Sequence, residues 1–226
     1  MAIFYDYKIQ TGENNMQIDS DLLDFAIKEN LTQPILRLYG WSPACVSLGR
    51  NQPETNINKD LCKKLGIDLT RRLTGGRALL HDDELTYSFI CPTEFLQNKD
   101  SVILSYKEIS WALIEGMDEL GITLEFPENK KAQSKFDYCM SISTGADLSY
   151  KNKKLIGSAQ FRKQGYILQH GSILISYDKE KIESIFNEKV DENSITAISE
   201  IDKEIMIKEI AESIKSGFSK YFNLRF

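Results

Sequence analysis

The sequence predicts an α+β fold with a largely antiparallel or mixed sheet and flanking helices. Segments with a helical spacing of apolar residues occur near both ends and in the middle, whereas segments with alternating apolar residues come in hairpin-like groups. Helices and strands do not alternate strictly, as they would in a parallel βαβ sheet. No repeat, low-complexity tract or Pro/Gly/Ser-rich linker interrupts the 226 residues, so we predict a single domain over residues 1–226.

Four segments carry helical patterns. Residues 20–30 place several apolar side chains on one face, and residues 58–65 form a short helix. Asp100 and Ser101 are suitable caps for a third helix, which Gly121 ends. The strongest amphipathic stripe predicts a C-terminal helix at about 200–222, and its apolar residues are Ile207, Ile210, Ile214, Phe218 and Tyr221.

Strand patterns occupy the stretches between these helices. Two strands are predicted at residues 34–39 and 44–49, separated by a Trp-Ser-Pro turn, and two more at 67–72 and 84–91. Short strands joined by turns follow up to about Tyr177.

Composition excludes several classes of protein. The 42% hydrophobic and 27% charged residues are those of an ordinary globular protein, and the net charge of −5 argues against a general nucleic-acid binder. No apolar run approaches the roughly 18 residues of a membrane span, and no secretory signal begins the chain. We therefore expect a cytoplasmic, monomeric protein without nucleic-acid or membrane partners.

Charge is unevenly distributed along the chain. Residues 128–165 hold eight Lys/Arg against three Asp/Glu, and residues 178–204 hold nine Asp/Glu against four Lys/Arg. Each segment can simply be a solvated surface. Alternatively, the basic segment faces an acidic partner or a phosphate-bearing carrier.

The four cysteines are too scattered for a paired metal-ligand pattern. Cys45, Cys62 and Cys91 lie in apolar strand or helix patterns, so we expect them in the core. Cys139 instead has polar and basic neighbours, which is a poor setting for an inert core thiol.

Two segments stand out from generic scaffold, and each contains one of the two histidines of the chain. The first runs from residue 71 to 81 and reads RRLTGGRALLH. Adjacent glycines between two strands allow backbone N–H groups to line a ligand, although a simple hairpin turn with solvated arginines explains them equally well. Its candidate binding residues are Arg71, Arg72, Thr74, Gly75, Gly76, Arg77 and His81.

The second segment runs from Lys153 to Ile173 and contains KKLIGSAQ followed by LQHGSI. Its small residues suit an apolar acyl chain lying along the backbone, and tight sheet packing is the alternative. The candidate binding residues here are Gly157, Ser158, Ala159, His170 and Gly171.

Together these two segments resemble the signature blocks of the biotin/lipoate A/B protein ligase family. Cys139, the Asp147-Leu148 pair and Lys154 are most similar to its branch of octanoyl-[acyl carrier protein]:protein octanoyltransferases. The resemblance covers about residues 35–176 and implies the catalytic-domain fold of that family.

The resemblance implies a two-step reaction. Cys139 takes an octanoyl group from the phosphopantetheine arm of acyl carrier protein and passes it to a lysine of the glycine-cleavage H protein or of the lipoyl domains of 2-oxoacid dehydrogenases. Lys154 would stabilise the Cys139 thiolate, the reactive form of the thiol. The reaction then requires neither ATP nor a metal.

Three alternatives remain at this level. An ATP-dependent lipoate–protein ligase has the same fold but does not need Cys139. An octanoyl amidotransferase between lipoyl-domain proteins also uses a cysteine. A non-catalytic acyl- or lipoyl-binding module would keep the pocket alone.

Overall fold

The computed structural model describes residues 2–54, 56–127 and 147–226. Its main sheet has six strands in the order β1-β2-β6-β9-β8-β7. β1 and β2 are parallel, and the other neighbours are antiparallel. The strands span Ile3–Gln10 (β1), Ile35–Trp41 (β2), Glu84–Pro92 (β6), Leu148–Tyr150 (β7), Lys153–Lys163 (β8) and Tyr166–Leu174 (β9).

A second, smaller sheet lies at one end of the first and has the order β4-β3-β5. β3 pairs in parallel with β4 and antiparallel with β5. These strands span Cys45–Leu48 (β3), Asp68–Arg71 (β4) and Leu79–His81 (β5).

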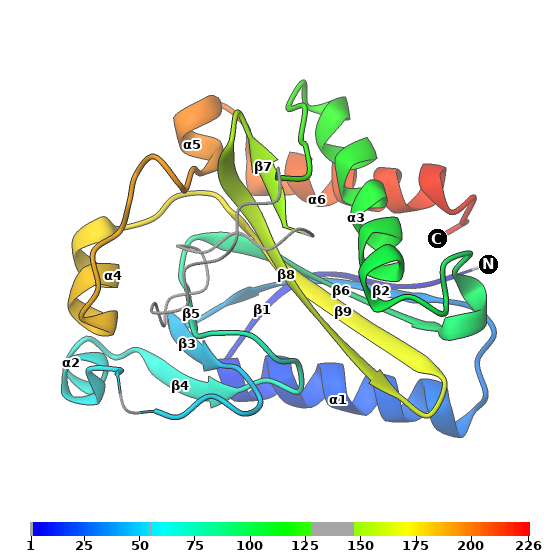
Figure 1. Cartoon of the computed structure of the whole chain (residues 1–226), viewed down its shortest axis with the longest axis horizontal. Helices are drawn as coiled ribbons and strands as arrows, with labels where there is room; N and C mark the ends of the chain where they lie inside the picture. Colours follow the sequence, from blue (N-terminus) through cyan, green and yellow to red (C-terminus); the bar gives the residue numbers. More distant parts are fainter. Residues whose placement is uncertain (1, 55, 128–146) are drawn as a thin grey trace.

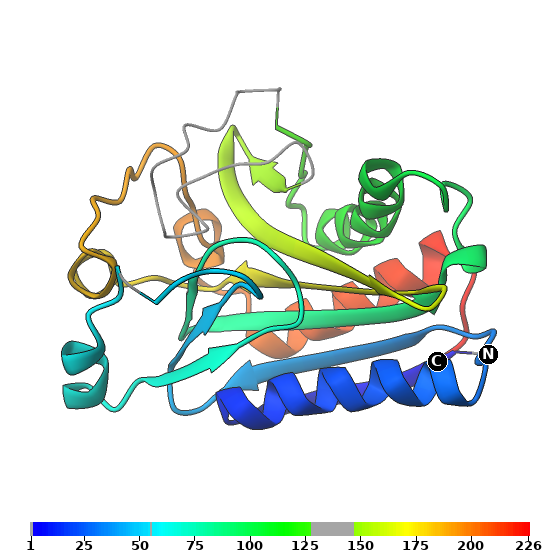
Figure 2. The ribbon, with the colours of Figure 1, turned by 60° about the horizontal axis from the view of Figure 1, so that its bottom comes forward.

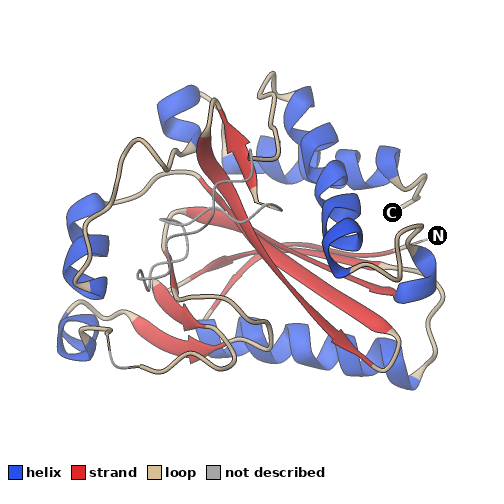
Figure 3. Ribbon diagram, viewed as in Figure 1, coloured by secondary structure: helices blue, strands red, loops and turns tan. Residues whose placement is uncertain are grey.

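Helices cover both faces of the main sheet (Figures 1 and 2). α1 runs along one face, and the packed pair of α3 and α6 covers the other. α2, α4 and α5 lie beside the small sheet and the end of the main one, as the colouring by secondary structure in Figure 3 shows. The helices span Gly12–Lys28 (α1), Lys59–Lys64 (α2), Val102–Glu119 (α3), Lys179–Phe186 (α4), Ile198–Ile201 (α5) and Ile207–Tyr221 (α6), and η1 is a single 3₁₀ turn at Thr93–Phe95.

The alternation of side chains along β6 explains why helices lie on both faces. Tyr87 and Phe89 point to one face and contact Phe218 of α6, with ring centroids 6.0 and 4.8 Å apart. Ile90 points to the other face and packs against the apolar stripe of α1, which includes Leu23. Every residue of β6 from Glu84 to Cys91 is buried, and the polar residues Glu84, Thr86 and Ser88 alternate with apolar or aromatic ones.

The α+β prediction is confirmed, and most predicted elements occur within a few residues of their expected places. Ser101 caps α3, and Gly121 follows its end with φ of 73°. The C-terminal prediction is partly wrong, because residues 202–206 break the segment into α5 and α6. The single-domain boundary at residues 1–226 stays a prediction.

The sequence did not reveal β1, β5, α4 or the first two turns of α1. β1 is a half-exposed edge strand, so its apolar alternation is weak. The first turns of α1 are polar in sequence, yet Thr11 caps the helix by accepting a hydrogen bond from Asn14 N–H. These elements depend on tertiary contacts more than on local periodicity.

Candidate functional site

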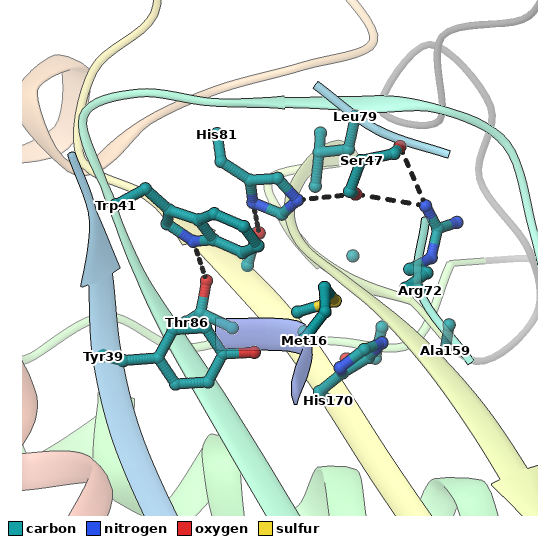
Figure 4. Close-up of a pocket in the computed structure, with 14 residues that line it drawn as sticks. Met16, Tyr39, Trp41, Ser47, Arg72, Leu79, His81, Thr86, Ala159 and His170 are labelled. Carbon is teal, nitrogen blue, oxygen red and sulfur yellow. Dashed lines mark hydrogen bonds between the residues drawn. The ribbon is translucent and has the colours of Figure 1, made fainter. Parts of the chain in front are cut away.

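A pocket opens where α1, the small sheet and the middle of β8 and β9 meet (Figure 4). The space that it encloses, including the open solvent at its mouth, is about 420 Å³. Both distinctive sequence segments contribute to its wall. The lining residues are Met16, Tyr39, Trp41, Ser47, Arg72, Leu79, His81, Thr86, Gly157, Ser158, Ala159, His170, Gly171 and Ser172.

Small residues of β8 and β9 keep one wall of the pocket thin. A Cβ on Gly171 would lie 2.3 Å from Ser158 Oγ and 2.7 Å from the carbonyl oxygen of Gly157. The two strands therefore approach each other more closely here than a side chain at residue 171 would allow. At this position the strands are tightly packed, and the same small residues line the pocket.

The opposite wall combines apolar and aromatic surface with polar groups. The indole of Trp41 stacks on the His81 ring at a centroid distance of 3.8 Å and an angle of 15°. Met16 of α1 and Leu79 of β5 add apolar surface. An apolar ligand with one polar end matches such a lining.

One chain of hydrogen bonds connects α1 to the glycine loop after β4. Asp19 Oδ2 lies 3.2 Å from His170 Nδ1, and His170 Nε2 lies 2.8 Å from Thr74 Oγ1. Arg72 Nε donates to the same Thr74 oxygen at 3.1 Å. A carboxylate only accepts, so His170 carries its proton on Nδ1 and accepts from Thr74 through Nε2.

Asp19 is also neutralised by a buried arginine. Arg37 Nη1 donates to Asp19 Oδ1 at 2.7 Å, and Tyr39 donates to Oδ2 at 2.9 Å. Burial by itself would raise the pKa of Asp19, but His170 and Arg37 outweigh it and hold that pKa below its usual value. Burial lowers the pKa of His170, only partly offset by Asp19, so this histidine is neutral at pH 7.

A second hydrogen-bond chain has the same order of groups: a carboxylate, a histidine, a hydroxyl and Arg72. Glu84 Oε1 lies 2.9 Å from His81 Nδ1, and His81 Nε2 lies 2.7 Å from Ser47 Oγ. Arg72 Nη1 donates to that Ser47 oxygen at 3.2 Å. His81 therefore also carries its proton on Nδ1 and accepts through Nε2.

Glu84 Oε1 collects further donors from the pocket wall. Trp41 Nε1 donates to it at 3.0 Å, and the Thr86 hydroxyl donates to it as well. Burial alone would raise the pKa of Glu84, but His81 and the hydrogen bonds of Ser172 and Thr86 hold it below its usual value. The carboxylate is therefore ionised at neutral pH.

Arg72 joins the two chains and shapes the glycine loop. Besides Thr74 and Ser47, its guanidinium donates through Nη2 to the carbonyl oxygens of Gly75 and Arg77, at 3.0 and 2.7 Å. Gly76 has φ of 96°, in the left-handed region that favours glycine. A Cβ on the facing Gly49 would lie 1.9 Å from the Gly76 carbonyl oxygen, so the two backbones touch.

The remaining candidates of the first segment lie away from the pocket lining. Arg71 is exposed and donates to the carbonyl oxygens of Gly49 and Gln52, at 2.7 and 2.8 Å. It orders the loop after β3. Gly75 and Gly76 are exposed, and their roles in binding ligand stay predictions.

Lys154 is almost completely buried and does not line the pocket. Its Nζ lies 2.9 Å from Asp147 Oδ2, and both side chains are at most 2% exposed. Asp147 Oδ1 in turn lies 3.5 Å from the backbone N–H of Ser158 in the pocket wall. Asp147 of the Asp147-Leu148 pair noted in the sequence is thus the ion-pair partner of Lys154.

Cys139 lies outside the described residues, so its predicted contact with Lys154 stays a prediction. The other three thiols are buried, as expected. Burial raises the pKa of Cys45 to about 12 and that of Cys91 further, which makes both unreactive. Among the described residues, no group of three or more His, Cys, Asp and Glu side chains could hold a metal ion.

Sequence reasoning missed one member of the first hydrogen-bond chain and two members of the second. Asp19, Ser47 and Glu84 belong to ordinary-looking helix and strand segments. One signal was available: Arg37 is a charged residue within a strand that is otherwise apolar from Ile35 to Trp41. A buried charge requires a partner, but the sequence does not say which.

The chain belongs to the family of the lipoyl protein ligase A/B catalytic domain, whose model matches residues 11–219. It is 37% identical to the octanoyltransferase LipM of Clostridioides difficile, over 97% of this chain and 86% of that protein. It is 35% identical to the octanoyltransferase LipM of Lysinibacillus sphaericus, over 91% of this chain and 81% of that protein.

Solved structures support the fold. The T. acidophilum protein Ta0514 with bound lipoic acid matches with a TM-score of 0.78 at 22% identity, covering 100% of this chain and 88% of its own. A lipoate-protein ligase A bound with ATP also gives 0.78 at 22% identity, covering 100% and 87%. In the part of the chain described here, no helix has the length and apolar character needed to cross a membrane.

Proposed function

We propose that this protein is an octanoyltransferase of protein lipoylation. The observation that carries the proposal is its similarity to the LipM octanoyltransferases over nearly the whole chain, at 37% identity to the C. difficile protein. The pocket supports it, since both signature segments border one cavity whose small-residue wall suits an acyl chain.

The proposed reaction proceeds through an acyl-enzyme. The Cys139 thiolate attacks the octanoyl thioester on the phosphopantetheine arm of acyl carrier protein; a new C–S bond forms, and the pantetheine thiolate leaves. A lysine amine of a lipoyl-domain or H protein then attacks the acyl-enzyme, giving an amide and restoring the thiol. Aminolysis of a thioester runs downhill, so the proposed reaction needs no ATP and no metal.

Lys154 is the proposed cation that stabilises the thiolate. Its ion pair with Asp147 supports this role by fixing the position of the buried amino group. We also propose that the octanoyl chain lies in the pocket of Figure 4. The loop at residues 75–77 and the small residues Gly157, Ser158 and Ala159 would then bind it.

Intact-protein mass spectrometry tests the acyl-enzyme. After incubation with octanoyl carrier protein, we expect one octanoyl adduct that hydroxylamine removes, because thioesters react with hydroxylamine. Cys139→Ser should lose both the labile adduct and the transfer activity, whereas Cys62→Ala, a substitution of a buried thiol away from the pocket, should keep both. Full transfer by Cys139→Ser would contradict the mechanism.

Separate donors test the substrate class. Octanoyl carrier protein, octanoyl H protein and free lipoate with ATP are each supplied with a lipoyl-domain acceptor. We expect transfer from octanoyl carrier protein in the absence of ATP. Transfer only from free lipoate with ATP would identify a ligase, and transfer only from octanoyl H protein would identify an amidotransferase.

A further inference from the structure

The second step of the proposed reaction releases a proton that the first does not. When a thiolate exchanges with a thioester, one thiolate replaces another and no proton needs a destination. When an amine attacks, its nitrogen loses a proton as the amide forms. If the proposed function holds, some group in the pocket must receive this proton.

The two hydrogen-bond chains that meet on Arg72 look alike but differ in charge balance. The Asp19 chain is neutralised by Arg37, whose guanidinium lies 2.7 Å from the carboxylate. Burial lowers the pKa of His170, and Asp19, already paired with Arg37, offsets this only in part, so a second proton on His170 is disfavoured.

Among the described residues, no Lys or Arg forms an ion pair with Glu84. Within the described part of the chain, the ion pair formed by Glu84 is with His81 itself, at 2.9 Å. A proton arriving at His81 Nε2 would turn this contact into a buried imidazolium–carboxylate pair and neutralise the carboxylate. The two histidines thus occupy matching hydrogen-bond positions, but within the described residues the carboxylate behind His170 is paired with an arginine and the carboxylate behind His81 is not.

The Glu84 chain also reaches the ligand space. Ser47 and His81 both line the pocket, and Ser47 Oγ lies 2.7 Å from His81 Nε2, which accepts from the hydroxyl when Nδ1 donates to Glu84. Arg72 donates to the same oxygen at 3.2 Å, so the hydroxyl oxygen is held by a donor on one side and an acceptor on the other. Figure 4 shows this row of Arg72, Ser47 and His81 along one wall.

We infer that Ser47, His81 and Glu84 form a proton relay that accepts the proton of the attacking lysine amine. The C–N bond forms, and the amine proton passes to Ser47 Oγ while the hydroxyl proton passes to His81 Nε2. The C–S bond then breaks, and the sulfur leaves with the electron pair. The imidazolium returns its proton through Ser47 to the thiolate, so that thioester and amine give amide and thiol.

The surroundings of the relay contain few other charges. Arg72 lies at the serine end and His170 across the pocket. The tyrosines and the thiol near Glu84 are protonated at neutral pH, because burial and this carboxylate raise their pKa values. These side chains are Tyr7 of β1, Tyr39 of β2 and Cys45 of β3.

Two matched glutamine variants separate the relay from simple positioning. A glutamine oxygen can accept the hydrogen bond that histidine Nε2 accepts, but it cannot take up a proton. We expect His81→Gln to slow single-turnover transfer from the preformed octanoyl enzyme by about 100-fold or more, which is the usual contribution of acid–base catalysis. Acylation of His81→Gln by octanoyl carrier protein should change far less.

His170→Gln is the control. Its hydrogen-bond position is equivalent, but its carboxylate is already neutralised by Arg37. We expect it to slow acylation and transfer alike, by less than about tenfold. Ser47→Ala, which removes only the hydroxyl, should behave as His81→Gln does.

Added imidazole provides a readout that a purely structural role would not change. In His81→Ala, free imidazole can enter the vacated space and accept the proton, so the transfer rate should rise with imidazole concentration. The inference requires both the selective loss in His81→Gln and this rescue. If either is absent, or if acylation falls as much as transfer, the relay is overturned. If the wild-type protein forms no octanoyl adduct, the proposed function fails instead.

Discussion

At the scale of single residues, buried charge organises the pocket. Asp19, Arg37 and His170 are at most 6% exposed and satisfy one another through short contacts. A buried ionic group costs folding free energy unless it is paired, and each of these side chains supplies the partner that offsets the burial of another. Their arrangement fixes the His170 ring that holds Thr74 in the glycine loop.

This arrangement predicts how stability depends on pH. The pKa of His170 is lowered below its ordinary 6.5, so the unfolded chain binds a proton that the folded chain excludes. The free energy of unfolding should therefore fall as the pH drops from 7 toward 5, by up to about 1.4 kcal/mol per pH unit for this group. Asp19 adds a further loss only below its ordinary value of 3.8.

Urea unfolding at pH 7, 6 and 5 measures this dependence. His170→Gln keeps a hydrogen-bonding side chain without a titrating group, so it should flatten the slope over that range. An unchanged slope in the variant would show that His170 is protonated in the folded protein.

At the scale of elements, the contact between α3 and α6 depends on small residues. A Cβ on Gly217 would lie 2.3 Å from the carbonyl oxygen of Ala112 and 2.4 Å from the backbone nitrogen of Gly116. These are backbone atoms, which cannot rotate away. The close crossing places Phe218 against Tyr87 and Phe89, so it sets the packing of one whole face of the sheet.

Gly217→Ala should therefore destabilise the protein, although alanine is the better helix former. The helix-propensity gain is about 1 kcal/mol, whereas forcing two backbones apart costs about 1–3 kcal/mol or more. Thermal and urea unfolding should both register the loss. Glu212→Ala, at an exposed position of the same helix, should change stability by less than about 0.5 kcal/mol.

At the scale of the whole molecule, charge is separated along the chain. The basic segment 128–165 and the acidic segment 178–204 differ in sign, while the chain carries −5 overall. Lys151 and Lys153 of the basic segment lie at the turn between β7 and β8. A basic surface attracts an acidic protein over a distance that salt shortens, so we expect these two lysines to favour the encounter with the proposed carrier protein.

Lys153→Glu should raise the KM for octanoyl carrier protein by about three- to tenfold and leave kcat unchanged, because it acts on encounter rather than on chemistry. The effect should shrink as ionic strength rises. Lys208→Glu makes the same charge change at an exposed position of α6 and serves as the control. Equal effects of the two variants would show that net charge, and not the patch, attracts the carrier.

The sequence by itself determined the fold class, the core cysteines and the two segments that border the pocket. It could do so because periodicity, caps and paired glycines are local signals: Ser101 and Gly121 bound α3, and Leu85, Tyr87 and Phe89 share the buried face of β6. The family resemblance depended on the same local motifs.

Only the tertiary structure decided how the polar groups of the pocket are partnered. Asp19 and His170 are 151 residues apart, and Ser47 and His81 are 34 apart, yet each pair is in hydrogen-bonding contact. No local period reports such contacts, because they arise where different elements bury their polar side chains against one another. The pairing of Glu84 with His81, and of Asp19 with Arg37, sets the difference in charge between two otherwise matching histidines.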